Sequence, residues 1–106
     1  VRVKRRSLPV AKVTDLEDGR TKVVQVDDYR IAICKVGSEV FAIEDVCTHD
    51  YGPLGGGRLD GHAIECPRHG ARFDVRDGKV LRMPAAAGVK TFPVHEKDGQ
   101  IYVEIE

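Results

Sequence analysis

Two short motifs, each pairing one cysteine with one histidine, constrain this 106-residue chain more than any other feature. The first is Cys47-Thr48-His49 and the second is Cys66-Pro67-Arg68-His69, with sixteen residues between His49 and Cys66. Both motifs lie in a glycine-rich stretch, because positions 47–61 alone hold five glycines and one proline. Ordering such loops costs much conformational entropy, so the sequence predicts a metal centre that holds them in place.

The segments on either side of this stretch predict an all-β fold. Asp-Gly pairs, which are typical of tight turns, recur at 18–19, 60–61, 77–78 and 98–99. Segments rich in β-branched and aromatic residues lie between the turns, and Ile101, Val103 and Ile105 alternate with polar residues as in a half-buried strand. The expected strands are 22–26, 29–36, 39–44, 62–66, 91–96 and 101–105. No stretch of ten or more residues has helical periodicity.

Length and composition fit one ordinary globular domain, residues 1–106. We expect antiparallel sheets, arranged as a sandwich, with a loop-rich, metal-binding subdomain inserted at about 45–86. The chain has 17 basic and 17 acidic side chains, so its zero net charge predicts no attraction to nucleic acid or to membrane surfaces. No window approaches the ~18 apolar residues of a membrane span.

The N-terminal segment and the cysteine count bear on the compartment. Arg2, Lys4, Arg5 and Arg6 are expected to form a solvated, frayed terminus, because no apolar export segment follows them. Three cysteines cannot all pair, and a disulfide scaffold is therefore not expected. These features predict a cytoplasmic protein.

Two thiolates and two imidazoles fit two kinds of metal site. A structural zinc site can use Cys₂His₂ ligands, but its halves usually hold either both cysteines or both histidines. Each half is mixed here, which favours a [2Fe–2S] cluster with both cysteines on one iron and both histidines on the other. Zinc remains the alternative.

The segments Cys47-Thr48-His49 and Cys66-Pro67-Arg68-His69-Gly70 resemble the ligand motif of the Rieske family. In length and strand order the chain is similar to the small Rieske ferredoxins of bacterial multicomponent, aromatic-ring-hydroxylating oxygenases. The resemblance implies three antiparallel sheets and a third loop over the cluster at Met83-Pro84-Ala85-Ala86-Ala87. It also implies one [2Fe–2S] cluster, with the ligands Cys47, His49, Cys66 and His69.

The resemblance implies a monomeric carrier of single electrons, which connects a flavin-containing reductase to a terminal oxygenase. Two ferric ions and two sulfides leave two positive charges, which the thiolates of Cys47 and Cys66 cancel. One added electron then gives a charge of −1, so reduction has a modest electrostatic cost. The chain has no set of residues for bond chemistry, and we expect an electron-transfer component and not an enzyme.

High-potential relatives carry a disulfide between the ligand loops, at the positions of Gly52 and Arg68 in this chain. They also carry a serine and a tyrosine whose hydroxyls donate to cluster sulfur, at the positions of Ala71 and Phe73. Such hydrogen bonds stabilise the reduced cluster. Their absence here predicts a low potential, near the bottom of the roughly −150 to +300 mV that Rieske centres span.

Several other residues have a predicted place or role. Cys34 is expected to be buried within a strand and His95 to lie on the surface, while His62 could serve either the surface or the surroundings of the cluster. Asp50, Tyr51 and Arg68 flank the ligands, where loop packing and partner docking are both open. Pro53, Leu54 and Pro84 are expected to shield the cluster from water.

Three other functions stay open at this stage. The chain could be a small subunit of a reductase such as nitrite reductase, which stable co-purification with a large subunit would indicate. It could be a redox or iron sensor, although no basic surface supports DNA contact. It could also be a zinc-stabilised interaction module, which would be colourless and free of acid-labile sulfide.

Overall fold

The structure is a computed structural model, and it describes residues 6–48, 50–54, 57–83, 85 and 87–105. Within these residues the regular structure consists of short strands and one 3₁₀ turn, η1 (Val13–Asp15). The strands are β1 (Arg6–Lys12), β2 (Thr21–Val26), β3 (Tyr29–Val36), β4 (Glu39–Glu44), β5 (Arg58–Asp60), β6 (Ala63–Glu65), β7 (Arg72–Asp74), β8 (Val80–Arg82), β9 (Thr91–Phe92), β10 (Val94–Lys97) and β11 (Gln100–Ile105).

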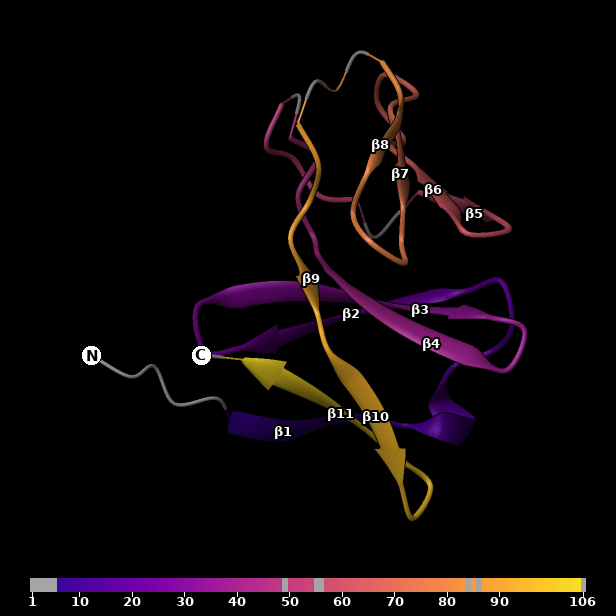
Figure 1. Cartoon of the computed structure of the whole chain (residues 1–106), viewed down its shortest axis with the longest axis vertical. Coiled ribbons are helices and arrows are strands. Elements are labelled where there is room, and N and C mark those ends of the chain that lie inside the picture. Colours follow the sequence, from indigo (N-terminus) through magenta and orange to yellow (C-terminus); the bar gives the residue numbers. More distant parts are fainter. Residues whose placement is uncertain (1–5, 49, 55–56, 84, 86, 106) are drawn as a thin grey trace.

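The described strands form three antiparallel sheets, seen one above another in Figure 1. The first sheet has the order β1-β11-β10, so the first and last described strands pair with each other. The second has the order β2-β3-β4-β9, and the third, at the top of the view, has the order β5-β6-β7-β8. The third sheet comes entirely from the glycine-rich middle of the sequence, between β4 and β9.

The second sheet is the middle layer, and β3 explains why. Four consecutive β3 residues, from Ile31 to Cys34, are fully buried. Side chains alternate between the two faces of a strand, so a continuous buried run requires cover on both faces. Ile31 and Ile33 join a core shared with Ile101 of the first sheet, and Ala32 and Cys34 join a core shared with the third sheet. The buried position expected for Cys34 is confirmed.

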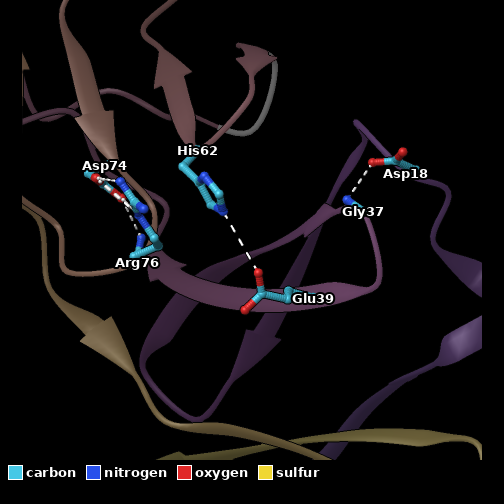
Figure 2. Close-up of polar contacts among 6 residues, drawn as sticks. All are labelled: Asp18, Gly37, Glu39, His62, Asp74 and Arg76. Atoms are coloured by element: carbon cyan, nitrogen blue, oxygen red, sulfur yellow. Dashed lines mark hydrogen bonds and ion pairs between the residues drawn. The ribbon is translucent and has the colours of Figure 1, made fainter.

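Polar contacts also attach the third sheet to the second (Figure 2). His62 precedes β6, and its ring points to Glu39 on β4, with 3.9 Å between Nε2 and Oε1. The same ring lies edge-on to Phe41, with centroids 5.7 Å apart. His62 therefore contacts the underlying sheet, and this contact links the insert to the framework.

The predicted strand 91–96 is interrupted at Pro93, and its two halves belong to different sheets. β9 pairs with β4 of the second sheet, whereas β10 pairs with β11 of the first sheet. Proline has no N–H to donate to a ladder, which suits it to the point where the chain changes sheet. The carbonyl of Pro93 still accepts a hydrogen bond from the Glu104 N–H at 3.0 Å.

The expectation of a frayed terminus was wrong for Arg6. This residue begins β1, pairs with Ile105 in the register of β11, and forms an ion pair with Asp27. Pairing with the last strand supplies the order that an isolated terminus lacks. Arg2, Lys4 and Arg5 lie outside the described residues. Within the part of the chain that is described, no helix has the length and apolar character needed to cross a membrane.

Candidate metal centre

The two predicted ligand loops have the same backbone hydrogen-bond pattern. In the first loop the Cys47 N–H donates to the Gly52 carbonyl at 2.7 Å, and the Cys47 carbonyl accepts from Tyr51 at 2.6 Å. In the second loop the Cys66 N–H donates to the Ala71 carbonyl at 2.7 Å, and its carbonyl accepts from Gly70 at 3.1 Å. Each cysteine therefore bonds to the residues four and five positions further on. The fourth residue has a positive φ in both loops, 60° at Tyr51 and 77° at Gly70.

These two loops bring the cysteines together in the interior. Cys47 follows β4 and Cys66 follows β6, and both side chains are buried. Their sulfurs and a carboxylate oxygen of Asp50 all lie within 4.8 Å of one another. A metal–thiolate bond is about 2.3 Å long, so this separation is compatible with two sulfurs on one metal ion.

Of the two predicted histidine ligands, the structure describes His69 only. His69 follows Arg68 in the second loop, its side chain is 53% exposed, and its Nδ1 lies 3.6 Å from a carboxylate oxygen of Asp50. His69 therefore lies close to the cysteine pair on the solvent side, because the Asp50 carboxylate is near both. His49 lies outside the described residues.

Asp50 and Arg68 form the main ion pair of the centre. The Arg68 Nε and Nη2 donate to the two carboxylate oxygens of Asp50, at 2.5 and 2.9 Å. These hydrogen bonds hold the pKa of Asp50 well below its usual range. They also raise the pKa of Arg68, and the charges of the Cys66 and Cys47 thiolates raise it further. Asp50 also accepts a hydrogen bond from the Gly52 N–H, so both of its oxygens already have donors, and we interpret it as the partner of Arg68 and not as a fifth ligand.

Apolar residues from three segments surround the sulfurs. Leu54, Ala71 and Phe73 are fully buried in the same cluster as Cys47 and Cys66. Burial of Leu54 agrees with its expected shielding role, whereas Pro53 is exposed and Pro84 lies outside the described residues. The third loop also reaches the first, because the Thr48 Oγ1 donates to the Ala87 carbonyl at 2.5 Å. This lining excludes water from the sulfur side of the centre.

Asp45 supports the first loop and was missed in the sequence. Its side chain is fully buried, accepts a hydrogen bond from the Leu54 N–H at 2.8 Å, and lies 3.2 Å from Nη2 of Arg30. It therefore ties the far end of the loop to the end of β4. A buried aspartate directly after a strand can be suspected from its position, but its partner nine residues later cannot be identified from spacing alone.

The loops, the paired sulfurs and the three sheets agree with one family. A model of the Rieske [2Fe–2S] domain matches residues 6–93. The chain belongs to the Rieske [2Fe–2S] family. A Rieske domain carries a [2Fe–2S] cluster, and the predicted all-β Rieske fold is confirmed.

Several relatives of this Rieske chain are ferredoxins. It is 34% identical over 99 residues to the ferredoxin component of the naphthalene 1,2-dioxygenase/salicylate 5-hydroxylase systems of Ralstonia sp, covering 93% of this chain and 95% of that protein. The structure of a Sphingomonas yanoikuyae B1 ferredoxin matches with a TM-score of 0.90 and 32% identity, covering 95% of this chain and all of that one.

A third match comes from the complex of reduced oxygenase and oxidised ferredoxin in carbazole 1,9a-dioxygenase. One chain of that complex aligns with a TM-score of 0.87 and 37% identity, covering 92% of this chain and 91% of that one. The prediction of a Rieske ferredoxin, an electron carrier that is not itself an enzyme, is confirmed by these relatives.

The residues present fit such a cluster. Two buried thiols from matching loops would hold the sulfur side, and the imidazole of His69 at the surface would offer a nitrogen ligand of the kind that a Rieske iron takes. When bound, the cluster accepts and releases one electron. The chain's own part is to hold the ligands, keep water from the sulfurs and leave the His69 side open to a partner.

Proposed function

We propose that this ferredoxin passes single electrons from a flavin-containing reductase to a terminal oxygenase of the aromatic-ring-hydroxylating type. It does so through one low-potential [2Fe–2S] cluster, which is bound within the subdomain 45–86 of a single-domain, monomeric, cytoplasmic protein. The ligands are Cys47, His49, Cys66 and His69. One observation carries the proposal: two buried cysteine sulfurs, from two loops with the same hydrogen-bond pattern, lie within 4.8 Å of each other.

The two loops support a division of roles between the ligands. The cysteines are buried, whereas His69 is exposed, so the cluster would present its histidine side to solvent. Imidazole is neutral and a weaker donor than thiolate, so the electron would rest on the iron that the histidines bind. Electron transfer would then take place where a partner can approach closely.

Two exposed apolar side chains, one in the first ligand loop and one at the start of the predicted third loop, support docking of a protein partner. Tyr51 in the first loop is 80% exposed, and Met83, just after β8, is 81% exposed. Large apolar side chains that gather on one surface are typical of sites where another protein binds. The similarity to a chain of the carbazole 1,9a-dioxygenase complex supports an oxygenase as that partner.

The ligand assignment is tested with single alanine variants of Cys47, His49, Cys66 and His69. Each should lose iron and acid-labile sulfide, or lose the rhombic electron paramagnetic resonance signal of the dithionite-reduced protein. Matched controls are Cys34→Ala and His95→Ala, since Cys34 lies in β3 and His95 is exposed on β10. Stoichiometric zinc without labile sulfide in the wild-type protein would contradict the proposal.

The partner assignment is tested by steady-state turnover of a reconstituted reductase, ferredoxin and oxygenase of the naphthalene dioxygenase type. The double variant Tyr51→Ser/Met83→Ser should raise the KM for ferredoxin about tenfold, because it removes the exposed apolar contacts. Val23→Ser is the matched control, since Val23 is an exposed apolar side chain on the edge strand β2. An equal effect of both variants, or no effect of either, would show that docking uses another surface.

A further inference from the structure

One arginine side chain reaches from the second ligand loop to the first. Arg68 lies between Cys66 and His69, and its guanidinium donates through Nε and Nη2 to Asp50, as described above. Its third nitrogen, Nη1, donates to the Pro53 carbonyl at 2.8 Å. All three guanidinium nitrogens therefore bind the first loop, across 15 to 18 residues of sequence.

The first loop is shaped around this guanidinium. A Cβ on Gly52 would lie 2.7 Å from Cζ and from Nη2 of Arg68, well inside contact distance. Gly52 does not have a positive φ, so the backbone conformation does not require glycine there. A side chain at this position would therefore displace the end of the Arg68 side chain and leave the backbone unstrained. The Gly52 N–H also donates to Asp50 at 3.0 Å, which fixes the carboxylate that receives the guanidinium.

The ion pair is well placed to hold the centre closed. Asp50 adjoins His49 in sequence, Arg68 adjoins His69, and the Asp50 carboxylate lies within 4.8 Å of both cysteine sulfurs. Only 32% of the Arg68 side chain and 23% of the Asp50 side chain are exposed. A planar, two-pronged pair of this kind fixes both distance and angle between its partners.

We propose that Asp50 and Arg68 are positioning residues, a noncovalent clasp that locks the two ligand loops together and limits release of the cluster. The inference rests on the proposed ligands, because the clasp acts through the loops that carry them. It also has an electrostatic consequence. The guanidinium and the Asp50 carboxylate carry opposite charges, so the intact pair adds no net charge near the cysteine sulfurs, and the loss of either partner alone should shift the midpoint potential.

The clasp is tested by the rate at which the cluster bleaches when the holoprotein is mixed with an iron chelator. Arg68→Ala and Asp50→Ala should each speed bleaching about tenfold, as expected for groups that support metal ligands. The double variant should be no faster than either single variant, because each already opens the clasp. Arg76→Ala is the matched control, since Arg76 pairs with Asp74 only two residues away and joins no loops.

Gly52→Ala gives an independent test, because it acts only through Arg68. Its methyl group should displace the guanidinium and speed bleaching in the wild-type background, and it should have no effect once Arg68 is alanine. Additive effects of Arg68→Ala and Asp50→Ala, or an equal effect of Gly52→Ala in both backgrounds, would overturn the clasp.

Arg68→Lys separates geometry from charge. Lysine keeps the positive charge but lacks the planar fork. We expect its midpoint potential to stay close to that of the wild-type protein while its cluster bleaches as quickly as that of Arg68→Ala. If the cluster of Arg68→Lys bleached as slowly as that of the wild-type protein, the planar guanidinium would not be needed to hold the loops. If the clasp proposal is wrong, the protein still has a cluster with a Rieske spectrum. If the ligand assignment is wrong, that spectrum is absent, so the two failures are distinguishable.

Discussion

Tyr51 and Gly70 occupy equivalent positions in the two ligand loops. Each lies four residues after its cysteine, donates its N–H to that cysteine's carbonyl, and has a positive φ. Glycine adopts this conformation readily, but an aromatic residue does so at a cost. The first loop therefore keeps a strained residue whose side chain is 80% exposed and contributes little packing of its own. Such strain is typical of functional positions, in agreement with a docking role for Tyr51.

Substitutions of Tyr51 and Gly70 should change the free energy of unfolding in opposite directions. Tyr51→Gly removes the strain of the left-handed conformation but increases the conformational entropy of the unfolded chain. We therefore expect a net gain in unfolding free energy of about 0.5–1 kcal/mol. Gly70→Ala introduces the same strain and should cost about 1 kcal/mol, since its new Cβ meets no atom within 4 Å. Urea unfolding of the two holoproteins measures both changes. A loss of stability in Tyr51→Gly would mean that the tyrosine side chain makes stabilising contacts.

The sequence was most informative where a local rule decides the structure. Turn pairs and alternation located β3, β4 and β11, because these strands are long enough to show a period. The ligand loops were located by residue type and spacing alone. The strands β1, β5, β7 and β8 were missed. Three residues are too few to show a period in β5, β7 and β8, and β1 depends on its long-range pairing with β11.

Long-range relationships were beyond what the sequence could show. Residues 91–96 were predicted as one strand, because nothing local assigns β9 and β10 to different sheets. Likewise, Asp50 and Arg68 were recognised as neighbours of the ligands, yet their pairing spans 18 residues. The close approach of Arg68 to Gly52 exists only in the folded loops. The structure alone shows that this glycine makes room for a side chain and does not serve a positive φ.

Cys34 should behave as a buried, unreactive thiol that plays no part in the cluster. Burial in β3, and secondarily the negative charge of Asp45, raise the pKa of this thiol to about 12. At pH 8 it therefore stays protonated and should resist iodoacetamide in the folded protein. Cys34→Ala should retain two irons per chain and an unchanged visible spectrum, while the small cavity costs about 1–2 kcal/mol. Mass spectrometry after labelling, together with iron analysis, checks both statements.

The free energy of unfolding should fall in acid, in part because Asp74 becomes protonated and loses its ion pair with Arg76. The hydrogen bonds from Arg76 lower the pKa of Asp74 below its ordinary value of 3.8. A carboxyl with a lowered folded pKa contributes stability that is fully present above the ordinary value and is lost as the pH falls through the folded one. Unfolding curves from pH 7 to pH 2.5 measure the effect.

The variant Asp74→Asn isolates this contribution from acid loss of the cluster, which both proteins share. It should be less stable than the wild-type protein at pH 7, and the difference should shrink below about pH 4. Arg76→Ala should reduce the same pH-dependent difference, since it removes the donors that lower the pKa of Asp74. A constant difference across the whole pH range would contradict the assignment.

Phe73→Tyr should raise the midpoint potential of the cluster. Phe73 on β7 is fully buried, pairs with Ile64 of β6, and belongs to the apolar cluster that contains Cys47 and Cys66. A hydroxyl buried there without an acceptor would cost about 1–3 kcal/mol, so it should seek the sulfur atoms of the centre. A hydrogen bond to sulfur stabilises the reduced cluster and so raises the potential.

A redox titration measures this change against two reference proteins. The wild-type midpoint itself should lie near the bottom of the Rieske range, and a value above about +100 mV would contradict a low potential. Phe73→Leu is the matched control, because it changes the packing without adding a donor and should leave the midpoint nearly unchanged. If Phe73→Tyr and Phe73→Leu shift the potential equally, packing and not hydrogen bonding to sulfur sets the potential at this position.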